Sequence, residues 1–535
     1  MLCHGTVCVV GKIRDLILQL SKSSIYSTKP KITLKNFGPI REFSIDLDKD
    51  FHLLIGQNSI GKSYAITAIY LIVKSLLQLK SRRSFPFTPF DYYLDFEPTQ
   101  LKGSDRKKVF KEFVDGNDIE KNITSFVIED LKSLFSIILT NELTNSFTNT
   151  FTSLNNLQNQ FNGEPAIIEL FCNYVSISIK LEGNRFVVSD IKNDDNYHIK
   201  KSKRNRNVHK GVNATYIYYR ENNANPDESL ARLIGEYTHY FVQRNFITMV
   251  AALTFELKNV HYLPASRSGL YQALSAFGQI IAELSKNRSF LSKKIELPSI
   301  SEPVSDYFIK LSDIRVVKRN YEDKKINFLA KEIEDSILDG KVEFNPQTKQ
   351  LLFYPNNTNL RLELSSTSSM VSELAPIVSY LRYVLTKSDE NIIRKMTQTT
   401  RDSKKAEPRS LIMIEEPEAH LHPEIQIRLT EIFAKLIDAN VKLIITSHSN
   451  FIFNKVNNLV IKNTSNGCTE GIHKDNVSSL VFKKTKTGSL ALPLSIDELG
   501  IEDNNFGPAT EQLFEEKMDI YSAINDDMED EANKK

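Results

Sequence analysis

Gly56-Gln57-Asn58-Ser59-Ile60-Gly61-Lys62-Ser63 is the stretch that decides the fold of this chain. It matches the pattern G-x-x-x-x-G-K-[ST], whose glycines let the backbone curl so that its N–H groups point inward at phosphate oxygens. The apolar residues 51–55 before it predict a strand, and the apolar residues 64–74 after it predict a buried helix. The sequence therefore predicts a strand–loop–helix unit that binds nucleotide phosphates. A glycine-rich turn with no ligand is the alternative.

Two residues of this loop have specific expected roles. Lys62 is expected to reach the β- and γ-phosphates of ATP, and the Ser63 hydroxyl is expected to bind Mg²⁺. The helix that begins near Lys62 adds the positive end of its dipole. ATP and Mg²⁺ are therefore the expected ligands.

A second motif supplies carboxylates. Leu411-Ile412-Met413-Ile414 is an apolar run that Glu415 and Glu416 close, as expected where a parallel strand ends at the edge of a sheet. We assign Glu415 to the metal and Glu416 to polarising the attacking water. An acidic loop without chemistry is the alternative. The next apolar run, 441–446, ends in Ser447-His448-Ser449, where His448 is placed to sense the γ-phosphate.

These motifs resemble the ABC-type ATPase heads of the Rad50/SMC/RecF/OLD group. The resemblance rests on residues 56–63, 415–423 and 446–449, and on the serine-rich segment 364–374. It implies an α/β fold, namely a P-loop ATPase head with a mixed sheet, discontinuous in sequence, with α+β insertions. No heptad run is long enough for a long coiled coil.

In the resembling ATPases, the serine-rich segment closes on the γ-phosphate that the other subunit binds. Here the resemblance implies that Ser368 and Ser369 donate to that phosphate, in a homo-oligomer whose heads sandwich ATP. The chain departs from the family because no glycine lies near Met370, which leaves the geometry of this contact open. Without the resemblance, the segment is a Ser/Thr helix cap.

Three further segments fit the same group. Residues 31–47 read as a hairpin that opens the head. His420 and His422 lie in a turn expected to contact the opposite subunit, with a metal pair as the alternative. Arg267, in a loop after an expected strand, is assigned either to phosphate or partner contact or to a surface salt bridge.

Within the group, the chain resembles the OLD-like PtuA ATPases of Septu anti-phage systems, including their retron-associated form. No Toprim pattern follows His448 and no H-N-H finger set is found. The resemblance implies an ATPase subunit that controls a separate HNH-type nuclease, together with a reverse transcriptase and its RNA–DNA in the retron form. The alternatives are a RecF/Rad50-like DNA-repair ATPase acting directly on DNA, a transporter-type ATPase, and a slow nucleotide-binding scaffold.

The expected domain boundaries follow from these motifs. We expect an N-terminal leader at 1–29 and an acidic tail at 516–535. The predicted head comprises residues 30–82, 256–275 and 340–515, interrupted by an α+β insertion at 83–255 and a helical insertion at 276–339.

One dense basic run stands out in a chain whose net charge is only +2. Its candidate nucleic-acid contacts are Lys200, Lys201, Lys203, Arg204, Arg206 and Lys210, and a solvated loop is the alternative. The four cysteines make no paired-ligand pattern and no stretch of about 18 apolar residues occurs, so a cytoplasmic protein without a membrane span is expected.

Overall fold

The computed structural model describes residues 29–81, 103–172, 175–204, 206, 208–211, 214–220, 226–254, 256–265, 267–273, 300–314, 324–385, 409–464, 471–503, 506–507 and 511–522. Residues 1–28, residues 276–299 of the expected helical insertion and residues 523–535 of the expected acidic tail lie outside these ranges. Contacts divide the chain into two units. The first comprises Met1–Gly38, Ser44–Asp48 and Leu71–Lys258, and the second comprises Pro39–Phe43, Lys49–Tyr70 and Asn259–Lys535.

The second unit is built on a mixed sheet whose strands come from distant parts of the sequence. Its strand order is β11-β15-β16-β3-β17-β18-β2. Neighbours from β15 to β17 pair in parallel, whereas β17 and β18 are antiparallel. The bounds are β11 Leu257–Leu263, β15 Arg409–Glu415, β16 Val441–Ser447, β3 Phe51–Gly56, β17 Val477–Thr485, β18 Gly488–Pro493 and β2 Ile40–Asp46. This order confirms the α/β class and a head that is discontinuous in sequence.

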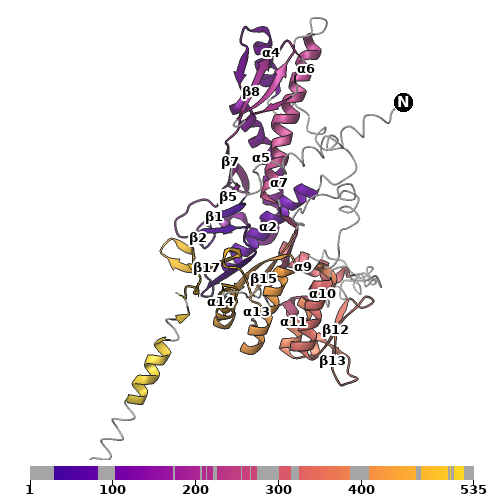
Figure 1. The fold of residues 1–535 in the computed structure, drawn as a ribbon, viewed down its shortest axis with the longest axis vertical. Helices are drawn as coiled ribbons and strands as arrows, with labels where there is room; N and C mark the ends of the chain where they lie inside the picture. The colour runs from indigo at the N-terminus through magenta and orange to yellow at the C-terminus, as the bar shows by residue number, and fades with distance from the viewer. Residues whose placement is uncertain are drawn as a thin grey trace, which may run out of the picture. The chain divides into compact units, whose positions relative to one another are not determined.

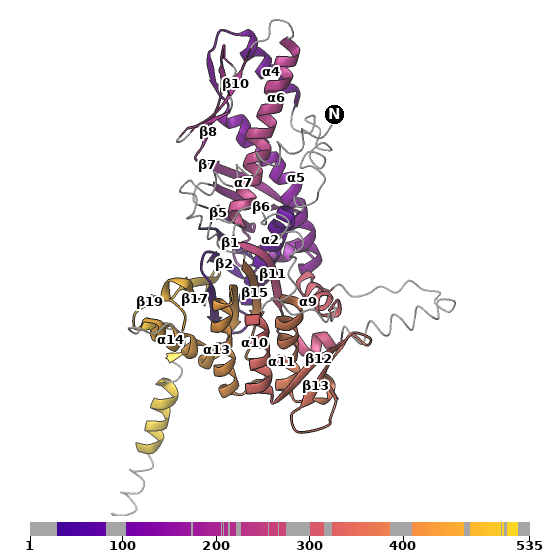
Figure 2. The ribbon, with the colours of Figure 1, turned by 45° about the vertical axis from the view of Figure 1, so that its right-hand side comes forward.

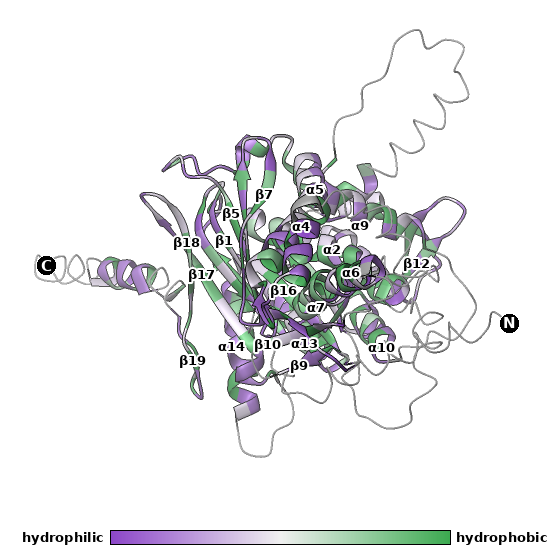
Figure 3. Ribbon diagram, turned by 90° about the horizontal axis from the view of Figure 1, so that it is seen from above, coloured by the Kyte–Doolittle hydropathy of each residue, from purple (hydrophilic) through white to green (hydrophobic). Residues whose placement is uncertain are grey.

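The central strands are apolar because both of their faces are covered. Every residue of β3 and β16 is buried, which is typical of parallel strands between helical layers. The covering helices are α9 Glu302–Ser312, α10 Lys324–Ile333, α11 Ser369–Ser379, α13 Pro423–Asp438 and α14 Asn450–Thr464. Helices α10, α11 and α13 lie side by side (Figure 2), and α13 contacts α14. One apolar core joins these strands and helices, and the hydropathy of α13 and β16 can be followed in Figure 3.

Smaller elements complete the second unit. A three-stranded antiparallel sheet contains β12 Gly340–Asn345, β13 Gln350–Pro355 and β14 Leu362–Glu363. Strands β19 Ile496–Asp497 and β20 Gly500–Ile501 form a short hairpin. The π-helical turns η6 Glu334–Leu338 and η8 Tyr380–Leu385 continue α10 and α11. The described part of the chain contains no long coiled coil, as the sequence predicts.

The first unit contains an antiparallel group of strands covered by a long helix. Its order is β1-β5-β6-β7, with bounds β1 Lys31–Phe37, β5 Ile167–Cys172, β6 Val175–Glu182 and β7 Arg185–Asn193. Helix α5, Thr124–Phe151, packs against β7. Phe147 of α5 meets Phe37 of β1 edge to face at 5.7 Å between ring centroids. Alternation of buried and partly exposed residues along β6 predicts such a one-sided packing.

A second small sheet belongs to the same unit and carries the basic run (Figure 1). Its order is β4-β8-β10-β9, with bounds β4 Glu120–Asn122, β8 Asn196–Lys201, β10 Ala214–Tyr219 and β9 His209–Lys210. Helices α4 Gly103–Asp115 and α6 Pro226–Glu236 contact each other, and α6 contacts β10. A π-turn, η4 Tyr237–Gln243, joins α6 to α7 Arg244–Leu253. No helix within the described ranges is long and apolar enough to cross a bilayer.

Candidate active site

The phosphate loop joins β3 to α2 (Lys62–Ser81), and two of its glycines are required by its backbone. Gly56 has φ +145°, and a Cβ atom there would lie 2.9 Å from the carbonyl oxygen of Phe482. Gly61 has φ +101°, and its Cβ would lie 3.0 Å from Ile40. Only glycine adopts such angles at low cost, so the loop keeps its curled form because both positions lack a side chain. Strand, loop and helix all form where the sequence predicts them.

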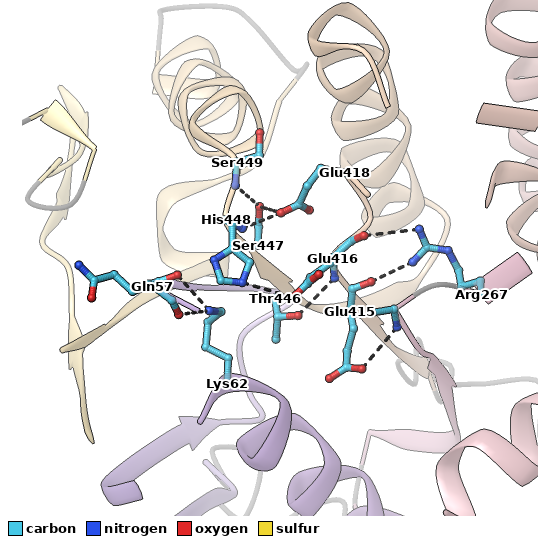
Figure 4. A network of polar contacts seen from close by, with 12 residues as sticks. Gln57, Lys62, Arg267, Glu415, Glu416, Glu418, Thr446, Ser447, His448 and Ser449 are labelled. Atoms are coloured by element: carbon cyan, nitrogen blue, oxygen red, sulfur yellow. Dashed lines mark hydrogen bonds and ion pairs between the residues drawn. The ribbon is translucent and has the colours of Figure 1, made fainter. Parts of the chain in front are cut away.

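Lys62 is buried inside this loop. Its Nζ donates to the carbonyl oxygens of Gly56 at 2.9 Å and Gln57 at 2.7 Å (Figure 4). Burial lowers the pKa of Lys62 to about 8, and the negative charges of Glu416, Glu418 and Glu415 oppose that shift. An ammonium group has three protons to donate, so one remains for a phosphate oxygen. The loop therefore holds the Lys62 ammonium group with one N–H donor left for a phosphate.

Glu415 ends β15 as a nearly buried carboxylate. Its Oε2 accepts a 3.4 Å hydrogen bond from the backbone N–H of Ala265. Its Oε1 is buried and has no hydrogen-bond partner within the described ranges. Burial raises the pKa of Glu415, while the nearby hydroxyls of Ser63 and Tyr262 act in the opposite direction. A buried carboxylate oxygen without a donor, beside the Ser63 hydroxyl, fits a hard cation such as Mg²⁺, which prefers oxygen ligands.

Glu416 follows directly and has a different environment. Its backbone is left-handed, with φ 42°, and its N–H donates to the carbonyl oxygen of Thr446 at 3.0 Å. Its carboxylate is about half-buried, and Oε1 lies 3.3 Å from Nε2 of His448. This contact with His448 lowers the pKa of Glu416, so the carboxylate is ionised at neutral pH. The pKa values of the two adjacent glutamates are therefore shifted in opposite directions, and the assignment of Glu415 to the metal and Glu416 to the water stays a prediction.

Glu418 holds the end of β16 in place, a role that the sequence did not reveal. Its Oε1 accepts hydrogen bonds from Ser447 Oγ at 2.8 Å and from the backbone N–H of His448 at 2.6 Å. Glu418 therefore fixes the backbone that carries His448, whose ring faces Glu416 (Figure 4). A third glutamate in the run 415–418 is the one sequence signal that could have indicated it.

Arg267 does not lie on the surface but in the interior of the second unit. Its side chain is fully buried, and its guanidinium donates to the carbonyl oxygens of Glu415 at 2.8 Å, Pro264 at 3.3 Å and Glu416 at 3.5 Å. Its Nε lies 3.5 Å from the Glu373 carboxylate on α11. The surface salt bridge expected as one alternative is therefore wrong, because sequence periodicity does not report such long-range contacts, whereas a contact with phosphate or a partner stays a prediction. Arg267 ties the turn after β15 to α11.

The serine-rich segment lies at the start of that helix. Ser368 is the N-cap of α11, and its side chain accepts a 3.3 Å hydrogen bond from the backbone N–H of Val371. Ser369 begins the helix, and both serines are exposed. No described contact joins either of them to the phosphate loop of the same chain. The helix-cap interpretation is therefore correct for Ser368, and its contact with a second subunit stays a prediction.

The two histidines of the turn before α13 also have defined places. His422 is the N-cap of α13, and its Nδ1 accepts from the backbone N–H of Glu424 at 3.4 Å. His420 is exposed and left-handed, with φ 60°. Across the described ranges, no group of three or more His, Cys, Asp or Glu side chains is arranged to hold a metal.

The basic run belongs to the first unit, and its residues have unlike environments. Lys200 pairs with Glu120 at 2.8 Å, Lys210 pairs with Asp195 at 3.5 Å, and Lys201 donates to the carbonyl oxygen of Val114 at 3.0 Å. Lys203, Arg204 and Arg206 are exposed. Lys200 and Lys201 are thus partly buried in contacts within the small sheet, whereas Lys210 is exposed like Lys203, Arg204 and Arg206.

This chain is similar to several solved structures and to one protein family. Solved structures similar to it include an Smc head bound to the C-winged helix domain of ScpA, with 11% identity over 88% of this chain and 98% of that one and a TM-score of 0.34. The Pyrococcus furiosus Smc head bound to the C-terminal domain of ScpA has 11% identity, 91% and 100% coverage, and a TM-score of 0.34. The Thermotoga maritima SMC head has 9% identity, 88% and 99% coverage, and a TM-score of 0.30.

A comparison with curated proteins gives no match. Residues 30–453, however, match the protein family described as the AAA ATPase domain. The match starts before β1, ends within α14, and includes the phosphate loop, Glu415, Glu416 and His448. The chain therefore belongs to the AAA ATPase domain family.

Proposed function

We propose that this ATPase hydrolyses ATP with Glu416 as the general base and His448 as its partner. The observation that carries this proposal is the convergence of Lys62, Glu415, Glu416 and His448 at the edge formed by β3, β15 and β16. Lys62 binds the β- and γ-phosphates, and Ser63 with Glu415 holds Mg²⁺, which neutralises phosphate charge when bound. Glu416, kept ionised, accepts a proton from the attacking water.

The geometry of Glu416 supports this role. The left-handed backbone turns its carboxylate away from the path of β15, and strain of this kind clusters at catalytic positions. His448 fixes one carboxylate oxygen, so the other oxygen is available to water. Glu418 and Arg267 hold the two backbone segments that bring this pair together.

The active unit in this proposal is a homo-oligomer of ATP-sandwiching heads. Ser368 and Ser369 are exposed at the N-terminus of α11, where the helix dipole and free N–H groups favour a phosphate. A partner head would present this end to the γ-phosphate. Arg267 would connect partner engagement at α11 with the Glu415–Glu416 turn, because it contacts both.

We further propose that ATP turnover controls a separate HNH-type nuclease in a bacterial anti-phage complex of the Septu kind, with a retron reverse transcriptase and its RNA–DNA as additional partners. The resemblance to PtuA ATPases supports this assignment. The alternative is a RecF/Rad50-like repair ATPase that acts directly on DNA. The exposed Lys203, Arg204 and Arg206 favour this alternative, which predicts that DNA stimulates turnover.

A purification from the native host separates these functions. Glu416→Gln, tagged and kept in Mg²⁺-ATP, is expected to co-elute with a small nuclease at a fixed stoichiometry, and a retron complex would also contain reverse transcriptase and its RNA–DNA. Lys62→Ala is the control, because the loss of the ammonium group weakens nucleotide binding and should release the same partner. An oligomer that carries only DNA in both variants would support the repair ATPase and contradict the effector assignment.

A further inference from the structure

A second concave site lies in the first unit, within the small sheet and helix α6. A pocket of about 240 Å³ is bounded by the end of β10, the segment after β8 and one side of α6 from Glu228 to Glu236. Four arginines line it, namely Arg204, Arg206, Arg220 and Arg232, and Tyr218 is beside them. They come from three separate stretches of sequence, so no linear motif contains this group.

The positive charges in this pocket exceed the negative ones. Two glutamates also line it, and one of them, Glu236, pairs with Arg232 at 3.1 Å. Arg204, Arg206 and Arg220 form no ion pair with any residue that the structure describes. The Arg206 guanidinium instead lies over the Tyr218 ring, 5.6 Å from its centroid. Three guanidinium groups therefore keep their donors for a ligand.

The lysines of the basic run behave differently. Lys200 is held by Glu120, and Lys201 donates to the carbonyl oxygens of Val114 at 3.0 Å and Gly116 at 2.5 Å. Lys210 pairs with Asp195. These three lysines therefore have partners within the first unit. Of the run, only Arg204 and Arg206 line the pocket, so the pocket and not the run is the coherent basic site.

The chemistry of this lining selects a phosphate. Guanidinium groups bind the oxygens of a phosphate through paired N–H donors. Several of them around one pocket favour a phosphate monoester dianion by its charge, and they can also bind the two non-bridging oxygens of a singly charged phosphodiester. The Tyr218 ring offers a flat surface next to them. The volume is below the roughly 300–1,000 Å³ of common small-molecule sites, so it suits one phosphate group with part of its ester.

We propose that this pocket binds a nucleotide phosphate ester, either within or at the end of a single-stranded nucleic acid or in a free nucleotide. The site is separate from the phosphate loop, and this inference does not depend on ATP hydrolysis. The pocket adds Arg220 and Arg232 to the contacts expected from the basic run.

The test measures binding of a fluorescent single-stranded DNA to the full chain by anisotropy, with a non-hydrolysable ATP analogue saturating the phosphate loop. Arg206→Gln combined with Arg220→Gln is expected to raise the Kd at least tenfold. It should also reduce the slope of log K against log salt by about 0.7, since the pocket holds one phosphate and each single-strand phosphate contact contributes about 0.7. Lys203→Gln is the matched control, because Lys203 is exposed in the same run but does not line the pocket. Its Kd should stay within twofold of the wild type.

Two further arms identify the source of the phosphate. A strand that binds equally with and without a 5′-phosphate supports a backbone diester, and dependence on that phosphate supports a strand end. If only adenosine monophosphate binds, and the double variant abolishes its binding in calorimetry, the ligand is a free nucleotide. The proposal is overturned if neither ligand binds, if the double variant binds as the wild type does, or if Lys203→Gln weakens binding as much. Unchanged ATP hydrolysis and melting temperature in the double variant show that its fold and ATP site are intact.

Discussion

The Lys62 ammonium group donates two of its three protons to carbonyl oxygens of its own loop. That arrangement orders the side chain before nucleotide binds, at the cost of burying an ammonium group. The cost appears as a pKa lowered to about 8. The same residue therefore gives the site its cation and makes that cation sensitive to mildly alkaline pH.

Nucleotide affinity should fall as pH rises above about 8. Below that pH Lys62 is charged, and a bound triphosphate raises its pKa further, so binding takes up a proton in the window above 8. The Kd of a non-hydrolysable ATP analogue should rise up to tenfold per pH unit there. Calorimetric titration between pH 7 and 9.5 measures it. Lys62→Ala should bind more weakly with no such rise, and an equal rise in Lys62→Ala would exclude Lys62 as the titrating group.

The elements of the site were predictable from sequence because each is encoded locally. The strand–loop–helix unit and the strands β15 and β16 follow from apolar runs closed by glycine, glutamate or histidine. Glu418 and Arg267 were not predictable in their roles, because both act through residues distant in sequence. The periodicity of apolar residues identifies a buried helix such as α11. It does not show that the Arg267 guanidinium pairs with Glu373 of that helix.

The link between α11 and β15 should depend on the buried pair of Arg267 and Glu373. Glu373→Gln leaves the Arg267 charge without its carboxylate, and breaking such a pair costs about 3–5 kcal/mol. Urea unfolding should report this loss, whereas Arg267→Met combined with Glu373→Leu should recover a large part of it. Glu424→Gln on the exposed start of α13 is the control and should change stability by less than about 0.5 kcal/mol. A double variant no more stable than Glu373→Gln would contradict the pairing.

At the scale of the whole molecule, one chain supplies only part of the proposed site. Lys62, Glu415, Glu416 and His448 come from one head, whereas Ser368 and Ser369 are exposed on α11 without contact to their own phosphate loop. The sequence indicates such a composite site only through the family resemblance. Nothing in the spacing of the serines distinguishes a helix cap from a contact with a partner.

Mixing two inactive variants tests the composite site. Ser369→Asp places a negative charge toward the partner's phosphate, while an acidic residue in the first turn of α11 favours the helix. Lys62→Ala removes the phosphate-loop cation. Neither variant should turn over alone, but mixed dimers contain one intact site, so an equal mixture should regain about a quarter of wild-type activity per chain. Tagged wild-type chains establish that subunits exchange. Exchange without any recovery would place both groups in the same chain's site.

The most direct measurement of the central claim is ATP turnover by Glu416→Gln together with the nucleotide that the protein retains. We predict that kcat falls by about 10²–10⁴, as expected when a general base is removed, while the Kd for ATP stays within about threefold and the bound nucleotide is ATP. Glu424→Gln should turn over as the wild type does. Equal turnover in Glu416→Gln and the wild type would contradict the account, because another group would then have to activate the water.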